Sequence, residues 1–233
     1  MPKRFLPLVI ILAVAAVAVG AGVVLYRANS ETLFAPIAGE LAASNPGAKP
    51  PHFRGAVKAT VVLEEFADLQ CPPCGTISGV LKKLEQEYTG RLRIVYRQFP
   101  LPMHNYAMDA AQAAEAAAIQ GRFWEMSDLL FQNQNAWSKA DNVQPIFEQY
   151  ATTIGLDLAQ FKADLGKRDL LDARIKADQD RGHAMEVTGT PTLFLNNQRV
   201  PQQSMSEPGL RTAIDAVLAG KPPFGGASPT PAP

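Results

Sequence analysis

The stretch Thr60-Val-Val-Leu-Glu-Glu-Phe66, followed by Cys71-Pro-Pro-Cys74, decides the fold. The first run is short, apolar and β-branched, which is typical of a buried strand. From Pro72 to about Tyr88 apolar residues recur at helical spacing, and Gly90 stands where a left-handed helix terminus is expected. A second strand is predicted over 92–96. A strand, a helix and a strand in this order predict a parallel pair joined by a crossover.

The rest of the domain follows from the same periodicities. Between about 104 and 185 the sequence has only amphipathic and alanine-rich helical patterns. A strand that opens with Pro191, a turn, an antiparallel partner over 198–200 and a last helix ending at Gly220 complete the chain. We therefore predict an α/β domain over 56–220, with a helical subdomain inserted into a small mixed sheet.

The two ends of the chain differ from this domain. Residues 5–26 carry no charge and would form a helix about 33 Å long, enough to cross a hydrocarbon core of about 30 Å. We interpret 1–27 as a transmembrane anchor or a cleaved signal segment, and the length favours the anchor. Residues 28–55 are predicted to be a linker. Residues 221–233, rich in proline, glycine and alanine, are predicted to be a disordered tail.

Charge indicates the compartment and excludes one class of partner. Lys3 and Arg4 precede the apolar span and Arg27 alone follows it closely, which favours a cytoplasmic N-terminus and a domain outside the membrane. That compartment permits disulfides. The 22 basic and 22 acidic residues cancel, so no long-range attraction to nucleic acid is expected.

The cysteine pair carries the chemistry. Unpaired amides and the helix dipole favour an anion at a helix N-terminus, so we predict a lowered pKa for Cys71. We expect Cys71 to be the exposed nucleophile and Cys74, one turn on, to resolve the mixed disulfide. A zinc site would need a second Cys/His pair, and haem attachment would need histidine where Gly75 stands. A structural disulfide between Cys71 and Cys74 is the remaining alternative to a redox-active pair. No cofactor motif occurs, so no cofactor or metal is expected.

Two further features accompany the pair. Thr190-Pro191 opens a strand, and a cis bond there would expose the Thr190 backbone to an extended peptide. The residues alone leave cis and trans open, since only about 5–6% of X-Pro bonds are cis. Glu64 and Glu65 end the first predicted strand. A buried member would have a raised pKa and exchange a proton with Cys74, whereas a solvated strand end would have no such role.

Taken together, these motifs resemble those of the DsbA-like thiol oxidoreductases of the thioredoxin superfamily. The resemblance covers roughly residues 52–220 and rests on Glu65-Phe66, Cys71-Pro-Pro-Cys74, Phe99-Pro-Leu101 and Val187-Thr-Gly-Thr-Pro191. It implies a thioredoxin fold interrupted by a helical domain, a cis Pro191 packed against the cysteines, and Glu65 as the buried acid. Between the two cysteines this chain has Pro-Pro, whereas the best-known oxidases have Pro-His. The resemblance therefore does not fix how strongly oxidising the pair is.

We therefore expect a membrane-tethered, extracytoplasmic thiol–disulfide oxidoreductase. Its substrates would be the thiols of exported proteins, bound as extended peptides, to which it donates disulfides. The resemblance implies reoxidation by a quinone-linked membrane partner that is DsbB-like or VKOR-like. A reductase or isomerase of the same fold, and a binding or chaperone module with a structural disulfide, are the alternatives.

Overall fold

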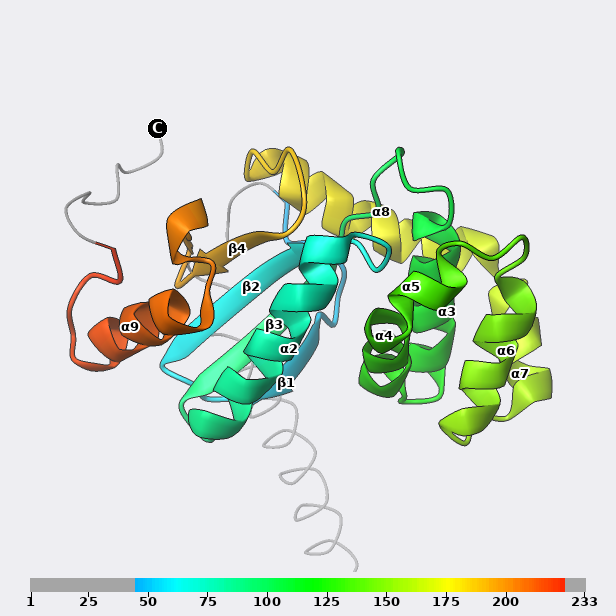
Figure 1. The fold of residues 1–233 in the computed structure, drawn as a ribbon, viewed down its shortest axis with the longest axis horizontal. Helices are drawn as coiled ribbons and strands as arrows, with labels where there is room; N and C mark the ends of the chain where they lie inside the picture. The colour runs from blue at the N-terminus through cyan, green and yellow to red at the C-terminus, as the bar shows by residue number, and fades with distance from the viewer. Residues whose placement is uncertain (1–44, 225–233) are drawn as a thin grey trace, which may run out of the picture. The chain divides into compact units, whose positions relative to one another are not determined.

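The structure, a computed structural model, describes residues 45–224. Its centre is a five-stranded sheet in the order β1-β3-β2-β4-β5 (Figure 1). The strands are β1 (His52–Gly55), β2 (Val61–Ala67), β3 (Leu92–Gln98), β4 (Thr192–Leu195) and β5 (Gln198–Arg199). Only β2 and β3 are parallel, and the other neighbouring pairs are antiparallel. The predicted small mixed sheet is confirmed.

Helix α2 (Pro72–Glu87) connects the parallel pair, as the sequence predicts. The register of β2 and β3 runs from Val61 opposite Leu92 to Ala67 opposite Gln98. Gly90, just beyond the helix, has a φ of +79°, the left-handed conformation that glycine adopts without steric cost. The start of α2 therefore lies at the carboxyl end of β2, where active sites of open α/β sheets are usually found.

Different helices cover the two faces of the sheet, because side chains alternate along each strand. Apolar residues of α2 and of α9 (Glu207–Leu218) form one cluster with those of β2, β3 and β4. Helix α8 (Arg168–Ala184) packs against the other face. A Cβ at Gly182 of α8 would lie 2.5 Å from the ring of Phe99 and 3.1 Å from that of Phe66, so the approach of α8 requires glycine.

The helical insertion is confirmed between β3 and β4 (Figure 1). Helix α3 at its centre contacts α4, α7 and α8, and most of its alanines are buried. Small side chains let neighbouring helices approach α3 on several sides. The inserted helices that precede α8 are α3 (Ala107–Ile119), α4 (Phe123–Gln132), α5 (Gln134–Trp137), α6 (Gln144–Thr153) and α7 (Leu158–Leu165).

A network of buried charges lies between the sheet and α8. The Oε1 atom of Glu64 accepts hydrogen bonds from Nε of Arg97 at 2.7 Å and from Nε of Arg181 at 2.8 Å. Arg97 also donates to Asp178 at 2.9 Å. Buried charges are tolerated when they are paired and hydrogen-bonded, as these four are.

The domain begins earlier than predicted, because this network holds the preceding chain. Arg97 donates to the carbonyl oxygen of Ala48 at 3.1 Å and to that of Pro46 at 3.3 Å, and Asp178 accepts from the Ala48 amide at 2.8 Å. Residues 52–55 then form β1. The predicted linker over 28–55 is therefore wrong for residues 45–55, whose partners lie too far along the chain to leave a local signal.

The remaining predicted end segments fall largely outside the described residues. The predicted anchor over 1–27, linker residues 28–44 and tail residues 225–233 all lie there. Within 45–224 no helix has the length and apolar character needed to cross a bilayer. The predicted tail begins later than residue 221, since Phe224 packs against the cluster formed by α2 and α9.

We predict that Glu64→Gln lowers the free energy of unfolding by about 3 kcal/mol at pH 7, because it leaves two guanidinium groups with one carboxylate fewer. Burial alone would raise the pKa of Glu64, but Arg181 and Arg97 together lower it below its ordinary value. The carboxylate therefore stabilises the fold above its unfolded-state pKa, and this contribution is lost as the pH falls through the lowered folded-state value. Urea denaturation at several pH values measures the difference.

The matched control is Glu125→Gln, which removes the same charge from the exposed pair of Arg122 and Glu125. It should change the free energy of unfolding by less than about 0.5 kcal/mol. Equal effects of the two substitutions would contradict a special role for the buried network.

Candidate active site

Cys71 and Cys74 occupy the N-terminus of α2, as predicted. Cys71 is the N-cap residue with an extended backbone (φ −74°, ψ 119°), and Pro72 and Pro73 take the first two helical positions. Prolines fit there because those amides have no partner within the helix. The Gly75 amide donates to the Cys71 carbonyl oxygen at 3.2 Å and closes the first turn. Both cysteines are free thiols.

The loop before β4 meets this turn. The Thr190–Pro191 peptide bond is cis, as the family resemblance implies. The Cys71 Sγ atom lies 3.4 Å from the carbonyl oxygen of Thr190, to which it donates a hydrogen bond when the thiol is protonated. The fold thus brings together two predicted site segments that lie 119 residues apart in the sequence.

The expectation of an exposed Cys71 is wrong. Only 4% of Cys71 and none of Cys74 is exposed. Besides the contact with Thr190, Gln134 of α5 holds the site from the helical insertion, because its Nε2 donates to the carbonyl oxygens of Leu69 at 2.8 Å and Cys71 at 2.9 Å. Cys71 remains the more accessible sulfur of the pair, by a small margin. The sequence gives no signal for Gln134, which lies far from the motif along the chain.

The two thiols differ strongly in acidity. A hydrogen bond from the Cys74 side chain lowers the pKa of Cys71 to about 6, in opposition to burial, and Thr190 and the Cys74 amide contribute further lowering. Burial, the hydrogen bond with Cys71 and the charge of Glu65 raise the pKa of Cys74 far above its ordinary value. At neutral pH the reduced site therefore holds a Cys71 thiolate and a Cys74 thiol. The pKa of Cys71 is lowered, the direction that the sequence predicts, and the side chain of Cys74 contributes more to this than the Cys74 amide does.

Strand alternation gives Glu64 and Glu65 opposite surroundings. Glu64 faces the arginines beneath α8, whereas Glu65 lies under α2 and is 3% exposed. Burial raises the pKa of Glu65 to about 8, with Arg54 opposing and Cys71 adding to the shift. Its Oε1 atom has no hydrogen-bond partner among residues 45–224. Glu65 is thus a largely protonated carboxyl group at neutral pH, near enough to Cys74 to affect its pKa.

A hydrogen-bonded pair that the sequence analysis missed, the buried Asp68 and the partly exposed His104, joins the two loops around the site. The Asp68 carboxylate accepts from the Gln70 amide at 2.7 Å, the Leu101 amide at 2.9 Å and Nδ1 of His104 at 2.7 Å. The Asp68 carbonyl oxygen also accepts from the Cys71 amide at 3.0 Å. Each residue flanks a quoted motif, but only the tertiary structure brings the two together.

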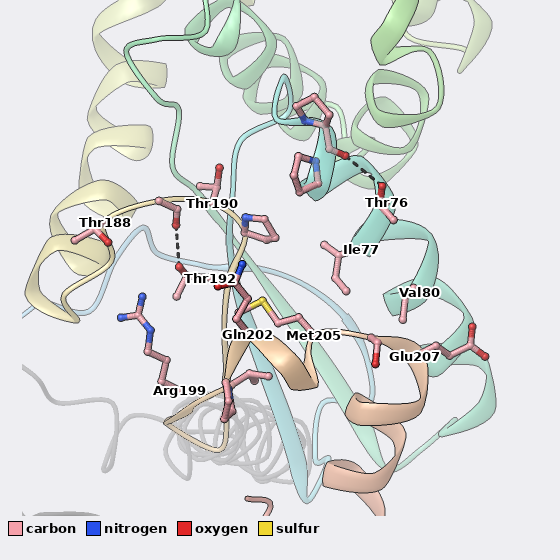
Figure 2. Close-up of a pocket in the computed structure, with 17 residues that line it drawn as sticks. Thr76, Ile77, Val80, Thr188, Thr190, Thr192, Arg199, Gln202, Met205 and Glu207 are labelled. Carbon is pink, nitrogen blue, oxygen red and sulfur yellow. Dashed lines mark hydrogen bonds between the residues drawn. The ribbon is translucent and has the colours of Figure 1, made fainter.

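An open groove of about 1250 Å³ lies beside the cis-proline loop (Figure 2). Figure 2 shows Thr76, Ile77 and Val80 of α2 along one side and Arg199 on the other. The lining is mostly uncharged, with Arg199 and Glu207 as its charged members. A groove of this size and polarity accommodates a segment of extended peptide next to Thr190.

Comparison with known proteins agrees with this geometry. Residues 48–216 match the family model described as thioredoxin. The chain belongs to the DsbA-like family of the thioredoxin superfamily.

Solved DsbA-like structures share the fold of this chain. The thiol–disulfide exchange protein alpha-DsbA2 of Wolbachia pipientis superposes with a TM-score of 0.65 at 17% identity, covering 82% of this chain and 98% of that one. BdbD of Bacillus subtilis superposes with a TM-score of 0.63 at 21% identity, covering 76% of this chain and 100% of that one. DsbA2 of Pseudomonas aeruginosa superposes with a TM-score of 0.56 at 30% identity, covering 72% of this chain and 95% of that one. These structures therefore share the fold of this chain over most of their own length.

Curated relatives of higher identity are much longer proteins. The Na(+)/H(+) antiporter NhaA 3 of Salinispora tropica is 42% identical over 149 residues, which cover 64% of this chain and 22% of that protein. The Na(+)/H(+) antiporter NhaA 1 of Salinispora arenicola is 38% identical over 170 residues, which cover 72% and 25%. The chain spans about a quarter of the length of these relatives.

We predict that Glu65→Gln stabilises the reduced protein at pH 8 and has little effect at pH 4. The unfolded carboxyl group ionises near pH 4.5, but the folded one keeps its proton up to about pH 8, so wild-type Glu65 increasingly destabilises the fold across this interval. The full difference is at most about 5 kcal/mol. Thermal melting of the reduced proteins from pH 4 to pH 9 measures it. Glu64→Gln, the neighbouring substitution, should destabilise instead, and parallel behaviour of the two variants would contradict this assignment.

Proposed function

We propose that this DsbA-like protein is an extracytoplasmic thiol–disulfide oxidoreductase that donates disulfides to exported proteins. The asymmetry of the cysteine pair carries the proposal. Cys71 is a thiolate next to the cis-proline loop, whereas Cys74 is a fully buried thiol. An inert structural disulfide has no need of such an asymmetry, since thiolate stability matters only to a bond that is opened and closed.

In the oxidised enzyme the two sulfurs form a disulfide. A substrate thiolate attacks the Sγ atom of Cys71, the Cys71–Cys74 bond breaks, and Cys74 leaves with the electron pair and takes up a proton. A second substrate thiolate then attacks the substrate sulfur of the mixed disulfide and expels Cys71 as a thiolate. Two electrons pass from the substrate dithiol to the enzyme, and one of the two substrate protons is released. The low pKa of Cys71 favours its departure, because more acidic thiols leave faster.

Glu65 is the proposed proton donor and acceptor for Cys74. Cys74 needs a proton when it leaves the disulfide and must lose one when the enzyme is reoxidised. A carboxyl group with a pKa of about 8 holds or releases a proton near physiological pH, and burial keeps water away from the exchange. Glu64 is unsuited to this role, since its two arginine partners keep it ionised.

The direction of exchange is proposed from the acidity of Cys71. A pKa of about 6 lies between the values of thioredoxin (about 7) and DsbA (about 3.5), so we expect a reduction potential between about −270 and −120 mV. Such a potential suits a moderate oxidase, reoxidised by a quinone-linked membrane partner of the DsbB or VKOR type. A tether formed by residues 1–27 would keep the domain near that partner.

Substitution of each cysteine tests the chemistry. Cys71→Ser should abolish the oxidation of a reduced, unfolded substrate by the full chain, because Cys74 alone cannot form the intramolecular disulfide that the substrate attacks. Cys74→Ser, first converted by oxidised glutathione to a mixed disulfide between Cys71 and glutathione, should instead exchange the glutathione for a substrate thiol. The resulting enzyme–substrate disulfide should accumulate as a covalent adduct in non-reducing electrophoresis, because no Cys74 thiol remains to release the substrate. Unchanged substrate oxidation by Cys71→Ser would favour the binding or chaperone module. Equilibration with glutathione separates the oxidase from a reductase, for which a potential near about −270 mV is expected.

The groove is the proposed binding site for the substrate peptide. Thr76 is exposed on its α2 wall, so Thr76→Arg should place a long charged side chain where the peptide binds. We expect KM for a cysteine-containing peptide to rise about tenfold, equivalent to about 1.4 kcal/mol of lost binding, with kcat little changed. Gln86→Arg adds the same side chain to an exposed position of α2 outside the groove and is the control. Equal KM values for the two variants would exclude the groove as the binding site.

A further inference from the structure

A buried carboxylate lies close to the redox pair and has no part in the exchange described above. Asp68 follows the end of β2, three positions before Cys71, and its side chain is 0% exposed. The Asp68 carbonyl oxygen accepts a hydrogen bond from the Cys71 amide at 3.0 Å, so Asp68 is held directly beside Cys71, where its negative charge disfavours the thiolate. An anion placed there makes the proposed oxidase weaker unless another group offsets its charge.

His104 is the group placed to offset it. Nδ1 of His104 lies 2.7 Å from Oδ2 of Asp68. A carboxylate can only accept, so Nδ1 carries the proton and donates it. The His104 ring is 21% exposed and lines an open cavity of about 790 Å³, which gives it contact with solvent. Within residues 45–224, His104 is the one basic side chain hydrogen-bonded to Asp68.

Other ionisable groups face this pair from each neighbouring element. Glu65 of β2 and Tyr96 of β3 are buried and have raised pKa values, so both are largely neutral at pH 7. Cys74 of α2 stays protonated. His183 of α8 lines the same cavity as His104, and its ring packs edge-on against Phe99, with centroids 5.3 Å apart. Among the described residues, therefore, only His104 combines a hydrogen bond to Asp68 with a solvent-accessible proton site.

We propose that His104 is a positioning residue of the redox centre. Its ring holds the Asp68 carboxylate and partly offsets the negative charge that Asp68 exerts on the Cys71 sulfur. Through Asp68 it sets the proportion of Cys71 thiolate and hence the oxidising strength of the pair. This inference rests on the proposed function, because it assigns a control element to the same site. It places that control at the entrance to the helical insertion, between β3 and α3.

Two substitutions should act in opposite directions. Asp68→Asn removes the charge and keeps a side-chain acceptor, so the equilibrium constant for oxidation of glutathione by the enzyme should rise roughly three- to tenfold. His104→Ala leaves the charge and removes its partner, so the same constant should fall by a similar factor of roughly three to ten. The double substitution should lack the separate His104 effect, since no charge remains to be offset.

His104→Asn is the matched rescue variant. An asparagine amide donates from about the position of Nδ1, so it keeps the hydrogen bond without a titrating ring. At pH 8 its equilibrium constant should lie closer to wild type than that of His104→Ala. The ultraviolet absorbance of the thiolate, titrated in the reduced full chain, provides a second readout. It reports mainly Cys71, because burial raises the pKa of Cys74 far above its ordinary value.

A purely structural role for the pair would give a different result. If the pair only anchors the loops, Asp68→Asn and His104→Ala should change the equilibrium constant in the same direction. His104→Asn and His104→Ala should then lower it equally. This outcome would overturn the inference. If Asp68→Asn does not fold, as judged by circular dichroism, the equilibrium constants of His104→Asn and His104→Ala are sufficient to test the inference. The glutathione equilibrium needs no protein substrate, so failure of the inference is separate from failure of the proposed oxidase, which wild-type substrate oxidation tests.

Discussion

The hydrogen bond that the buried Cys74 thiol donates to the Cys71 sulfur is the interaction on which the redox site depends. It contributes most to the low pKa of Cys71, and it needs a Cys74 that stays protonated. Burial of Cys74 under the helical insertion meets that need, because a desolvated thiol resists ionisation. The Cys74 amide in the first turn of α2 also lowers the pKa of Cys71, by less than the Cys74 side chain does.

The same strand supplies two buried carboxyl groups with opposite pKa shifts. Glu64 and Glu65 are adjacent, yet the pleat of β2 sends Glu64 to the arginines beneath α8 and Glu65 to the layer under α2. One is ionised and fixes the chain at residues 46–48 through its partner Arg97, while the other is protonated and lies near the cysteines. A shift of one residue in register would exchange these environments, so the alignment of β2 between β3 and β4 is a functional constraint as well as a structural one.

The helical insertion holds the loop that carries the cysteine pair. Gln134 fixes the carbonyl groups of Leu69 and Cys71, and His104, just before α3, holds Asp68. In the proposed function, these contacts would connect the oxidising strength of the pair to the inserted helices. Solved DsbA-like structures that cover most of their own length in the superposition share this architecture.

The sequence by itself determined the α/β class, the parallel β2–α2–β3 unit, the inserted helices and the position of the cysteine pair, because each rests on a local period or on a helix boundary. The resemblance added the cis state of Pro191 and the choice of Glu65, which local patterns leave open. Only the tertiary structure decided the burial of Cys71, the position of β1 in the sheet, and the hydrogen bonds of Asp68, His104 and Gln134. These features depend on hydrogen bonds and burial between segments that are far apart in the chain. Composition and local periodicity do not predict such long-range contacts.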